Sequence, residues 1–241
     1  MALAALAALA GAFVQSATGF GFALVLSPAL LAVLEPVEAV TTLLSLGLVL
    51  NLLVLFEHGR PEHVDWRPLV PVLLAAVPGL AVGLIALTQL SKEALQVTVG
   101  VAVILAAAWQ LLRGSRPARL PAGSGWLVGF LSGALTTSIS VSGPPVVIWL
   151  EARGISPEEF RASLAVSFFA FNLAGASLLV AAEGVGALDA ATILPLLVLV
   201  LAGHVLGALA FRRLDRERFF TAVLVLVAAT GLASIVAGLA G

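Results

Sequence analysis

The sequence predicts an all-helical integral membrane protein with about eight hydrophobic segments in two four-segment repeats. Of its 241 residues, 61% are hydrophobic and 10% are charged, whereas soluble domains carry about 25% charged residues. Stretches such as 69–90 stay apolar for about the 20 residues that a membrane helix needs. Strands of a membrane barrel would instead alternate apolar and polar residues. The third observation is that the two halves of the chain share residues at fixed offsets.

The hydrophobic segments are separated by short polar stretches. We expect them at 2–34, 37–56, 68–90, 94–112, 123–150, 160–182, 188–211 and 219–240. The polar stretch 113–125 is rich in Arg, Pro, Ser and Gly, as a connector between halves would be. The net charge is −1 and no block of basic residues favours nucleic acid. The absence of cysteine excludes disulfides and thiolate metal sites.

Residues recur between the halves in the same order. Pro36, Glu38 and Asn51 recur as Pro157, Glu159 and Asn172, each 121 positions later (157 − 36). Asp65, Pro71, Gly79, Gly83, Lys92 and Glu93 recur as Asp189, Pro195, Gly203, Gly207, Arg216 and Glu217, each 124 positions later (189 − 65). We therefore expect a first repeat at 1–113, a connector at 114–122 and a second repeat at 123–241. Many transporters are built from such repeats and bind substrate between them.

The first segment of each repeat is too long for a simple span and is interrupted. A helix over 2–34 would measure about 50 Å, against a hydrocarbon core of about 30 Å. Gly, Pro and hydroxyl residues occupy the middle of 2–34 and recur at 136–145, and such residues allow a helix to unwind at membrane depth. We expect broken helices whose second halves begin near Gly21 and Gly143.

The basic residues favour a re-entrant hairpin for 123–150. If that segment crosses the membrane, the twelve Lys and Arg divide five against seven between the two faces. If it returns to the same face, eleven lie together, as the positive-inside tendency requires: Arg60, Arg67, Arg113, Arg116, Arg119, Arg153, Arg161, Arg212, Arg213, Arg216 and Arg218, leaving only Lys92 opposite. Each unit then crosses three times, so the repeats are inverted and both termini lie outside.

The two breaks are the candidate binding site for an anion. The sequence places no charged residue deep in a span, so the free N–H groups at the start of each second half-helix would hold the negative charge. Hydroxyl and amide side chains nearby would add donors. The candidates are Ser16, Thr18, Gly19, Gly21, Ser27 and Asn51 in the first repeat, and Thr136, Thr137, Ser138, Ser140, Ser142, Gly143 and Asn172 in the second. The alternatives are close helix packing for the small residues and an interhelical hydrogen bond for the two asparagines.

Other polar or small residues have mainly structural interpretations. Gly125, Gly129 and Gly133, together with the pairs Gly79/Gly83 and Gly203/Gly207, recur every four residues and predict packing faces. His204 is ionisable and lies well inside a span, so it is a candidate for proton coupling as well as a hydrogen-bonded packing residue. His58 and His63 with Glu57 and Glu62 match no specific zinc spacing, and no metal or cofactor is expected.

Two stretches resemble the matching motifs of the TauE/SafE sulfite exporter family, also called the toluene sulfonate uptake permease family. They are GAFVQSATGFGFALVLSPALLAVLEP and GFLSGALTTSISVSGPPVVIWLEARGISPEEFRASLAVSFF, of which Gly143 to Arg161 is the most specific part. The resemblance covers nearly the whole chain. It implies secondary export of sulfite, an organosulfonate or a related sulfur-containing anion across the inner membrane of a bacterium.

Two other functions are alternatives to export. A passive anion channel would use the same site. An intramembrane serine protease would need a nucleophile such as Ser138, Ser140 or Ser142 within reach of His204, and the duplication has no rationale in a protease. The expected partners are a small anionic substrate and the lipid bilayer of the cell membrane, with no nucleic acid; a homodimer is left open.

Overall fold

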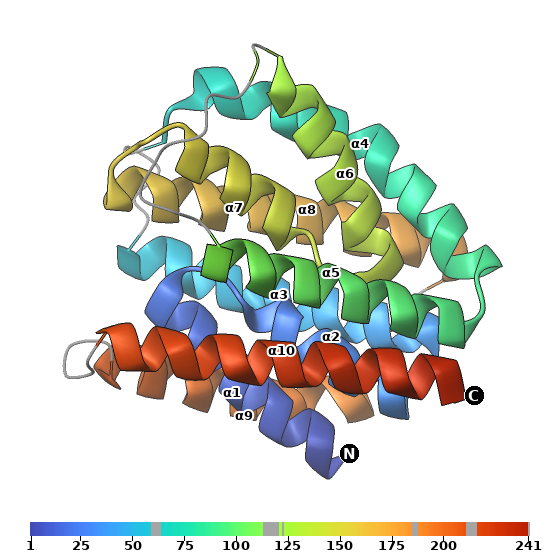
Figure 1. Ribbon diagram of the computed structural model, residues 1–241. Coiled ribbons are helices and arrows are strands. Elements are labelled where there is room, and N and C mark those ends of the chain that lie inside the picture. Colours follow the sequence, from blue (N-terminus) through green and yellow to red (C-terminus); the bar gives the residue numbers. More distant parts are fainter. Residues whose placement is uncertain (59–63, 113–120, 122, 185–187, 211–215, 241) are drawn as a thin grey trace.

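The described residues, 1–58, 64–112, 121, 123–184, 188–210 and 216–240 of a computed structural model, form ten α-helices and no strand (Figure 1). The helices are α1 (Ala2–Thr18), α2 (Phe22–Val33), α3 (Pro36–His58), α4 (Trp66–Gln89), α5 (Lys92–Leu112), α6 (Ser124–Ile139), α7 (Gly143–Ala152), α8 (Pro157–Glu183), α9 (Ala190–Ala210) and α10 (Arg216–Ala240). Six of them, α3, α4, α5, α8, α9 and α10, are long and apolar enough to cross a membrane. The prediction of an all-helical membrane protein is therefore confirmed.

The helix starts follow the same two offsets as the recurring residues. The starts of α2 and α3 recur 121 positions later in α7 and α8 (143 − 22, 157 − 36), and those of α4 and α5 recur 124 positions later in α9 and α10 (190 − 66, 216 − 92). Several recurring residues sit at these starts for a physical reason. Pro36 and Pro157 open α3 and α8, where a missing N–H costs no helical hydrogen bond.

Recurring aspartates cap two equivalent helices. Asp65 precedes α4 and accepts a hydrogen bond from the Arg67 N–H at 3.2 Å. Asp189 precedes α9 and accepts from the Ala191 N–H at 3.1 Å, the Thr192 N–H at 3.1 Å and the Thr192 hydroxyl at 2.6 Å. The Thr192 hydroxyl, together with these backbone N–H groups, lowers the pKa of Asp189 below its ordinary value. These side chains satisfy N–H groups that have no partner within the helix.

The chain reverses between α1 and α2. Gly19 and Gly21 adopt φ of 91° and 112°, a conformation that glycine tolerates without steric cost. A Cβ added at Gly11 would lie 2.9 Å from the Phe22 carbonyl oxygen, so the start of α2 lies against the middle of α1. Further along, Val25, Pro28 and Ala32 share an apolar hollow with the early residues of α1. The two helices form an antiparallel hairpin.

A second reversal separates α6 from α7. Ser140 ends α6 with φ of 59°, in the left-handed region. The Trp149 indole N–H on α7 donates to the hydroxyl of Ser124, the first residue of α6, at 3.1 Å. The later part of α7 therefore lies beside the beginning of α6. Each of the two long segments predicted from the sequence consists of two helices that fold back on each other.

Small residues allow α4 and α6 to pack closely. A Cβ at Gly79 or Gly83 would clash with the backbone of α6 at Phe130 or Ala134. Likewise, a Cβ at Gly129 or Gly133 would clash with the backbone of α4. In the other half, the α9 glycines Gly203 and Gly207 lie against α1 at the carbonyls of Leu9 and Phe13. The predicted packing faces are confirmed, and each joins a hairpin to a helix of the opposite half.

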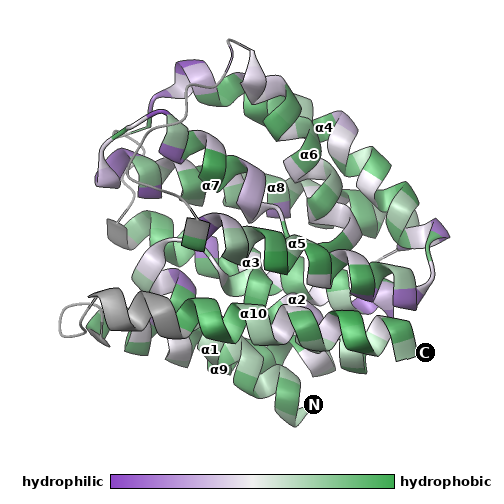
Figure 2. Cartoon of the chain, viewed as in Figure 1, coloured by the Kyte–Doolittle hydropathy of each residue, from purple (hydrophilic) through white to green (hydrophobic). Residues whose placement is uncertain are grey.

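The remaining long helices pair across the halves. Helix α5 packs on α10, and α3 packs on α8. Large apolar side chains on the outer helices are exposed, including Val77 and Ile85 on α4 and Val198 on α9, each at about 61–65% of their full area. Figure 2 shows hydrophobic residues along most of the helices and hydrophilic residues mainly toward their ends. Lipid is the medium in which such a surface is stable.

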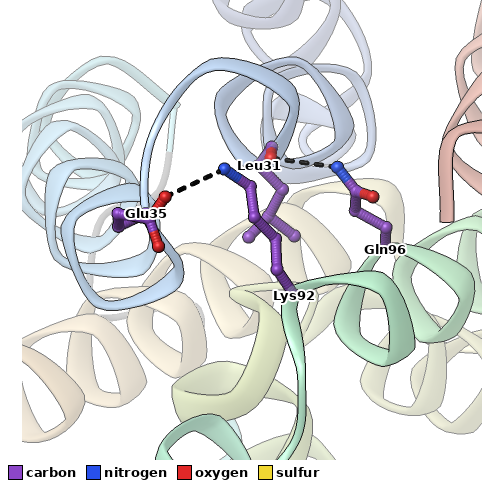
Figure 3. Close-up of polar contacts among 4 residues, drawn as sticks. All are labelled: Leu31, Glu35, Lys92 and Gln96. Carbon is purple, nitrogen blue, oxygen red and sulfur yellow. Dashed lines mark hydrogen bonds and ion pairs between the residues drawn. The ribbon is translucent and has the colours of Figure 1, made fainter. Parts of the chain in front are cut away.

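One polar cluster ties the far end of α2 to the start of α5 (Figure 3). The Gln96 amide donates to the Leu31 carbonyl at 3.1 Å, which is one of the last carbonyls of α2 and has no partner within that helix. Lys92 lies 3.2 Å from Glu35, whose side chain is 79% exposed, so this ion pair contributes little stability. The Gln96 contact therefore joins the C-terminal end of α2 to the early part of α5.

Candidate functional site

A cavity of about 30 Å³ lies between the two helix breaks. Its walls come from the α1–α2 turn, the α6–α7 turn, α3 and α8. The lining residues are Gln15, Phe20, Gly21, Phe22, Ala23, Leu24, Leu43, Asn51, Ser140, Val141, Ser142, Gly143, Phe168 and Asn172. Six of the thirteen sequence-predicted binding residues are among them: Gly21, Asn51, Ser140, Ser142, Gly143 and Asn172. The duplicated breaks therefore face one shared space.

The half-helices after the breaks differ in the donors they offer. Phe22, Ala23 and Leu24 open α2, and the first N–H groups of a helix have no intrahelical partner. In α7, Gly143 is followed by Pro144 and Pro145, which have no N–H. The first half thus supplies most of the main-chain donors. The second half must rely more on side chains.

Asn51 and Asn172 both line the cavity but differ in their hydrogen bonding. The Asn51 amide group donates to the Gly47 carbonyl at 2.8 Å, and its carbonyl oxygen accepts from the Gln15 amide at 2.7 Å. Asn172 is 7% exposed and makes no hydrogen bond to the part of the chain that the structure describes. Its amide lies against Gly47, where an added Cβ would be 2.5 Å away. The Asn51 amide is therefore satisfied by hydrogen bonds within the described protein, whereas the Asn172 amide could donate to a ligand.

The serines of the second turn also reach the cavity. The Ser140 hydroxyl donates to the Val40 carbonyl of α3 at 3.4 Å, a long hydrogen bond. Ser142 is 6% exposed and, among the described residues, has no hydrogen-bond partner for its hydroxyl. Ser142 and Asn172 are therefore two buried donors in the cavity lining.

Gln15 was not among the sequence-predicted binding residues, although it lines the cavity. It is 4% exposed, and its amide oxygen accepts from the Phe22 N–H at 3.3 Å while its amide nitrogen donates to Asn51. The signal in the sequence was a carboxamide in an otherwise apolar half-helix, because such a group is costly in a membrane unless it is hydrogen-bonded. Phe168 on α8 was also missed, since its aromatic ring is typical of a packed core.

Three predicted hydroxyls of α6 lie outside the cavity lining and donate to carbonyls. Thr136 and Ser138 donate at 2.6 Å to the carbonyls of Ser132 and Ala134, each four residues earlier. Thr137 donates to the Leu80 carbonyl of α4, also at 2.6 Å. Their hydrogens are committed to packing, which corresponds to the structural alternative weighed for them.

Apart from Gly21, the predicted residues of the first broken segment lie outside the cavity lining. Ser16 contacts His204, and Gly19 ends α1 with its N–H donated to the Gln15 carbonyl at 2.7 Å. The Thr18 hydroxyl lies 2.7 Å from the Phe20 carbonyl oxygen and steadies the turn. Ser27, on α2, donates to the Ile139 carbonyl at 2.7 Å.

Each broken helix end is closed by a side chain from the opposite half. Ser27 satisfies the last carbonyl of α6. The Arg161 guanidinium, near the start of α8, donates to the Ser16 and Ala17 carbonyls at the end of α1, at 3.0 and 3.2 Å. Sequence reasoning assigned Arg161 only to the cytoplasmic face. The structure shows that its side chain brings a formal positive charge to the first break, where the partial negative end of α1 favours it.

His204 lies beside Ser16 and outside the cavity. Its ring Nδ1 is 2.6 Å from the Ser16 hydroxyl, and the residue is 4% exposed. The contact joins α9 to the broken end of α1, next to Gln15. His204 is therefore linked to the cavity wall through the neighbouring residue of α1.

No cluster of His, Asp or Glu able to hold a metal is found among the described residues. His63 and Glu62, from the zinc alternative, lie outside the described residues, as do Arg60, Arg113, Arg116, Arg119, Arg212 and Arg213 from the charge argument. The connector predicted at 114–122 also falls almost wholly outside them. The predictions about these residues and about the connector are therefore not tested by the described structure.

Long apolar helices around a pair of helix breaks define a multi-pass membrane protein of the transporter class, since discontinuous helices are typical of transporter binding sites. The family model described as Sulfite exporter TauE/SafE matches residues 3–234. The chain belongs to the TauE/SafE sulfite exporter family, which is a family of membrane exporters and not of enzymes.

A curated relative agrees with this assignment. The chain is 29% identical over 167 residues to a protein of Cupriavidus necator described as "Probable sulfite/organosulfonate exporter TauE". The match covers 66% of this chain and 64% of that relative. No protein of known structure matches the chain.

Proposed function

We propose that this protein is a secondary transporter that exports a small sulfur-containing anion, sulfite or an organosulfonate. The observation that carries the proposal is the cavity shared by the two breaks. The N-termini of α2 and α7, Ser142 and Asn172 would surround an anion there. Main-chain N–H groups at helix N-termini favour negative charge, and amide and hydroxyl groups donate to sulfite or sulfonate oxygens. The family membership and the relative's printed description support this choice of substrate.

The size of the cavity favours a transporter over an open channel. About 30 Å³ is open to the centres of water-sized molecules, so this is a small cavity and not a wide pore. We propose that the helices around the breaks move when the cavity admits sulfite, which has four heavy atoms. A site that opens and closes in this way fits alternating access, in which one part of the protein moves against the other around the substrate.

The proposal includes inverted repeats with two re-entrant hairpins. The helix starts repeat at offsets of 121 and 124, each hairpin packs on a helix of the opposite half, and both hairpins reverse at their breaks. With six long helices as crossings, each half crosses three times, so its copy is inverted. Figure 1 shows both termini toward the same end of the bundle, as six crossings require. The hairpin tips would then meet near the middle of the membrane.

We propose His204 as the group that couples transport to protons. Its contact with the Ser16 hydroxyl connects it to the wall of the cavity, and the charged Arg161 side chain donates to the Ser16 carbonyl. A proton on His204 would change the field at the first break through this contact. With His204→Gln, an outward sulfite gradient should still drive flux, and an imposed pH gradient should no longer accelerate it.

The proposal is tested in proteoliposomes. Uptake of labelled sulfite and of several sulfonates is measured with and without a pH gradient. Saturable transport at a rate well below that of a channel is the expected result. If none of these anions moves under any gradient, the proposed function is wrong.

A further inference from the structure

The two halves of the site differ at one pair of corresponding positions, 15 and 136. Position 15 corresponds to position 136 at the offset of 121 (136 − 15). Gln15 reaches from α1 to Phe22 and Asn51, whereas Thr136 donates to the Ser132 carbonyl within its own helix. The carboxamide is therefore present in one half only, and the shorter hydroxyl of the other half does not enter the cavity.

The Gln15 oxygen occupies a position suited to an anion. It accepts from the N–H of Phe22, the first residue of α2, where the helix dipole is positive. Phe22 and Gln15 both line the cavity. A carboxamide oxygen carries partial negative charge, so it satisfies this donor in the absence of a full negative charge.

We propose that Gln15 is a built-in substitute for an oxygen of the transported anion and must leave Phe22 before the anion can bind across both halves of the site. The inference rests on the proposed function and concerns the order in which the hydrogen-bond donors of the cavity bind the anion. Gln15 occupies the donor of the first half by accepting from the Phe22 N–H, and its amide group donates to the Asn51 side-chain oxygen at 2.7 Å. Asn172 and Ser142, which have no partner among the described residues, receive the anion first. Release of Gln15 then frees Phe22 and Asn51 to complete the binding.

Two substitutions at Gln15 separate this role from a merely structural one. Gln15→Glu keeps an oxygen at Phe22 and makes that hydrogen bond charge-assisted, which roughly doubles its strength, although a carboxylate cannot donate to Asn51 as the amide does. The internal competitor becomes stronger, and the KM for sulfite should rise about tenfold. Gln15→Leu removes the competitor while keeping similar volume, and the KM should fall about three- to tenfold, as expected when the neutral hydrogen bond from Phe22 no longer has to be broken. Thr136→Val, the matched change in the other half, should leave the KM within twofold.

The measurement is labelled sulfite flux in proteoliposomes, together with sulfite-induced thermal stabilisation of each purified variant. Opposite shifts in KM for the two Gln15 variants support the inference. A shift in the same direction, or no shift, overturns it, because a packing residue or a direct ligand would weaken binding in both variants. If Gln15→Leu does not yield folded protein, Gln15→Ser removes the reach to Phe22 and is expected to lower the KM in the same way. Absence of flux in the wild-type protein would instead refute the proposed function.

Discussion

Replacing Asn172 with leucine tests whether Asn172 binds the substrate or only packs in the protein interior. Asn172 is buried in the cavity wall, and its amide has no hydrogen-bond partner among the described residues. Leucine has a similar size and no polar atoms. The substitution therefore removes a donor that the empty protein does not use and that the proposed complex does use.

The expected magnitude follows from that difference. A hydrogen bond to a charged group contributes about 1.5–3 kcal/mol, and each 1.4 kcal/mol corresponds to a factor of about ten. Sulfite binding should weaken about 10- to 100-fold in Asn172→Leu. Burying an amide without a partner costs about 1–3 kcal/mol in protein mutational data, so the empty variant should be as stable as the wild type or more stable.

Asn51→Leu is the matched control in the other half. Asn51 is bonded to Gln15 and Gly47, so its loss leaves the Gln15 amide group without its acceptor. We expect this variant to lose about 1–3 kcal/mol of stability. Binding is measured by titration calorimetry of the detergent-solubilised proteins, and stability by thermal unfolding. An Asn172→Leu variant that binds sulfite as the wild type does, or that is destabilised as much as Asn51→Leu, would refute the assignment of Asn172 to the site.

Three further predictions test the fold and its pH dependence. Gly79→Ala should reduce stability by about 1–3 kcal/mol, because its Cβ overlaps the Phe130 carbonyl on α6; thermal unfolding would show it, and an unchanged midpoint would contradict the close packing. Cysteines at Pro121 and Gly154, in a chain without native cysteine, should both be labelled by a membrane-impermeant reagent from the cytoplasmic face alone, whereas labelling from opposite faces would exclude the α6–α7 hairpin. The hydrogen bonds that lower the pKa of Asp189 stabilise the folded state above the ordinary value of 3.8. This stability is lost as pH falls through the lowered pKa, so acidification below about pH 4 should destabilise the wild type more than Asp189→Asn, and equal losses would contradict this.

The sequence predicted those parts of the fold that depend on local chemistry. Gly19 and Ser140 mark where α1 and α6 end, and Gly21 marks where α2 begins, because a left-handed backbone requires small or adaptable residues there. Asn51 and Asn172, which the sequence pairs at an offset of 121, both line the cavity.

The sequence did not show which polar groups face the cavity. Thr136, Thr137 and Ser138 form a cluster of hydroxyls in sequence, but all three donate to carbonyls of α4 or α6. A helical hydroxyl that bonds to a carbonyl four residues earlier has the same sequence signature as one that contacts substrate. The reach of Gln15 and Arg161 across helices depends on tertiary packing, which no local pattern encodes.

Each hairpin packs on a helix of the opposite half, and this arrangement constrains the order in which the protein can assemble during synthesis. The α1–α2 hairpin packs on α9, which is synthesised only after most of the chain has left the ribosome, whereas α4 packs on α6 from the other half. During biogenesis the first hairpin therefore enters the lipid without its main neighbour, and neither half can complete its own core. A gene split at the connector should consequently give two fragments that are individually degraded and that accumulate only when they are expressed together.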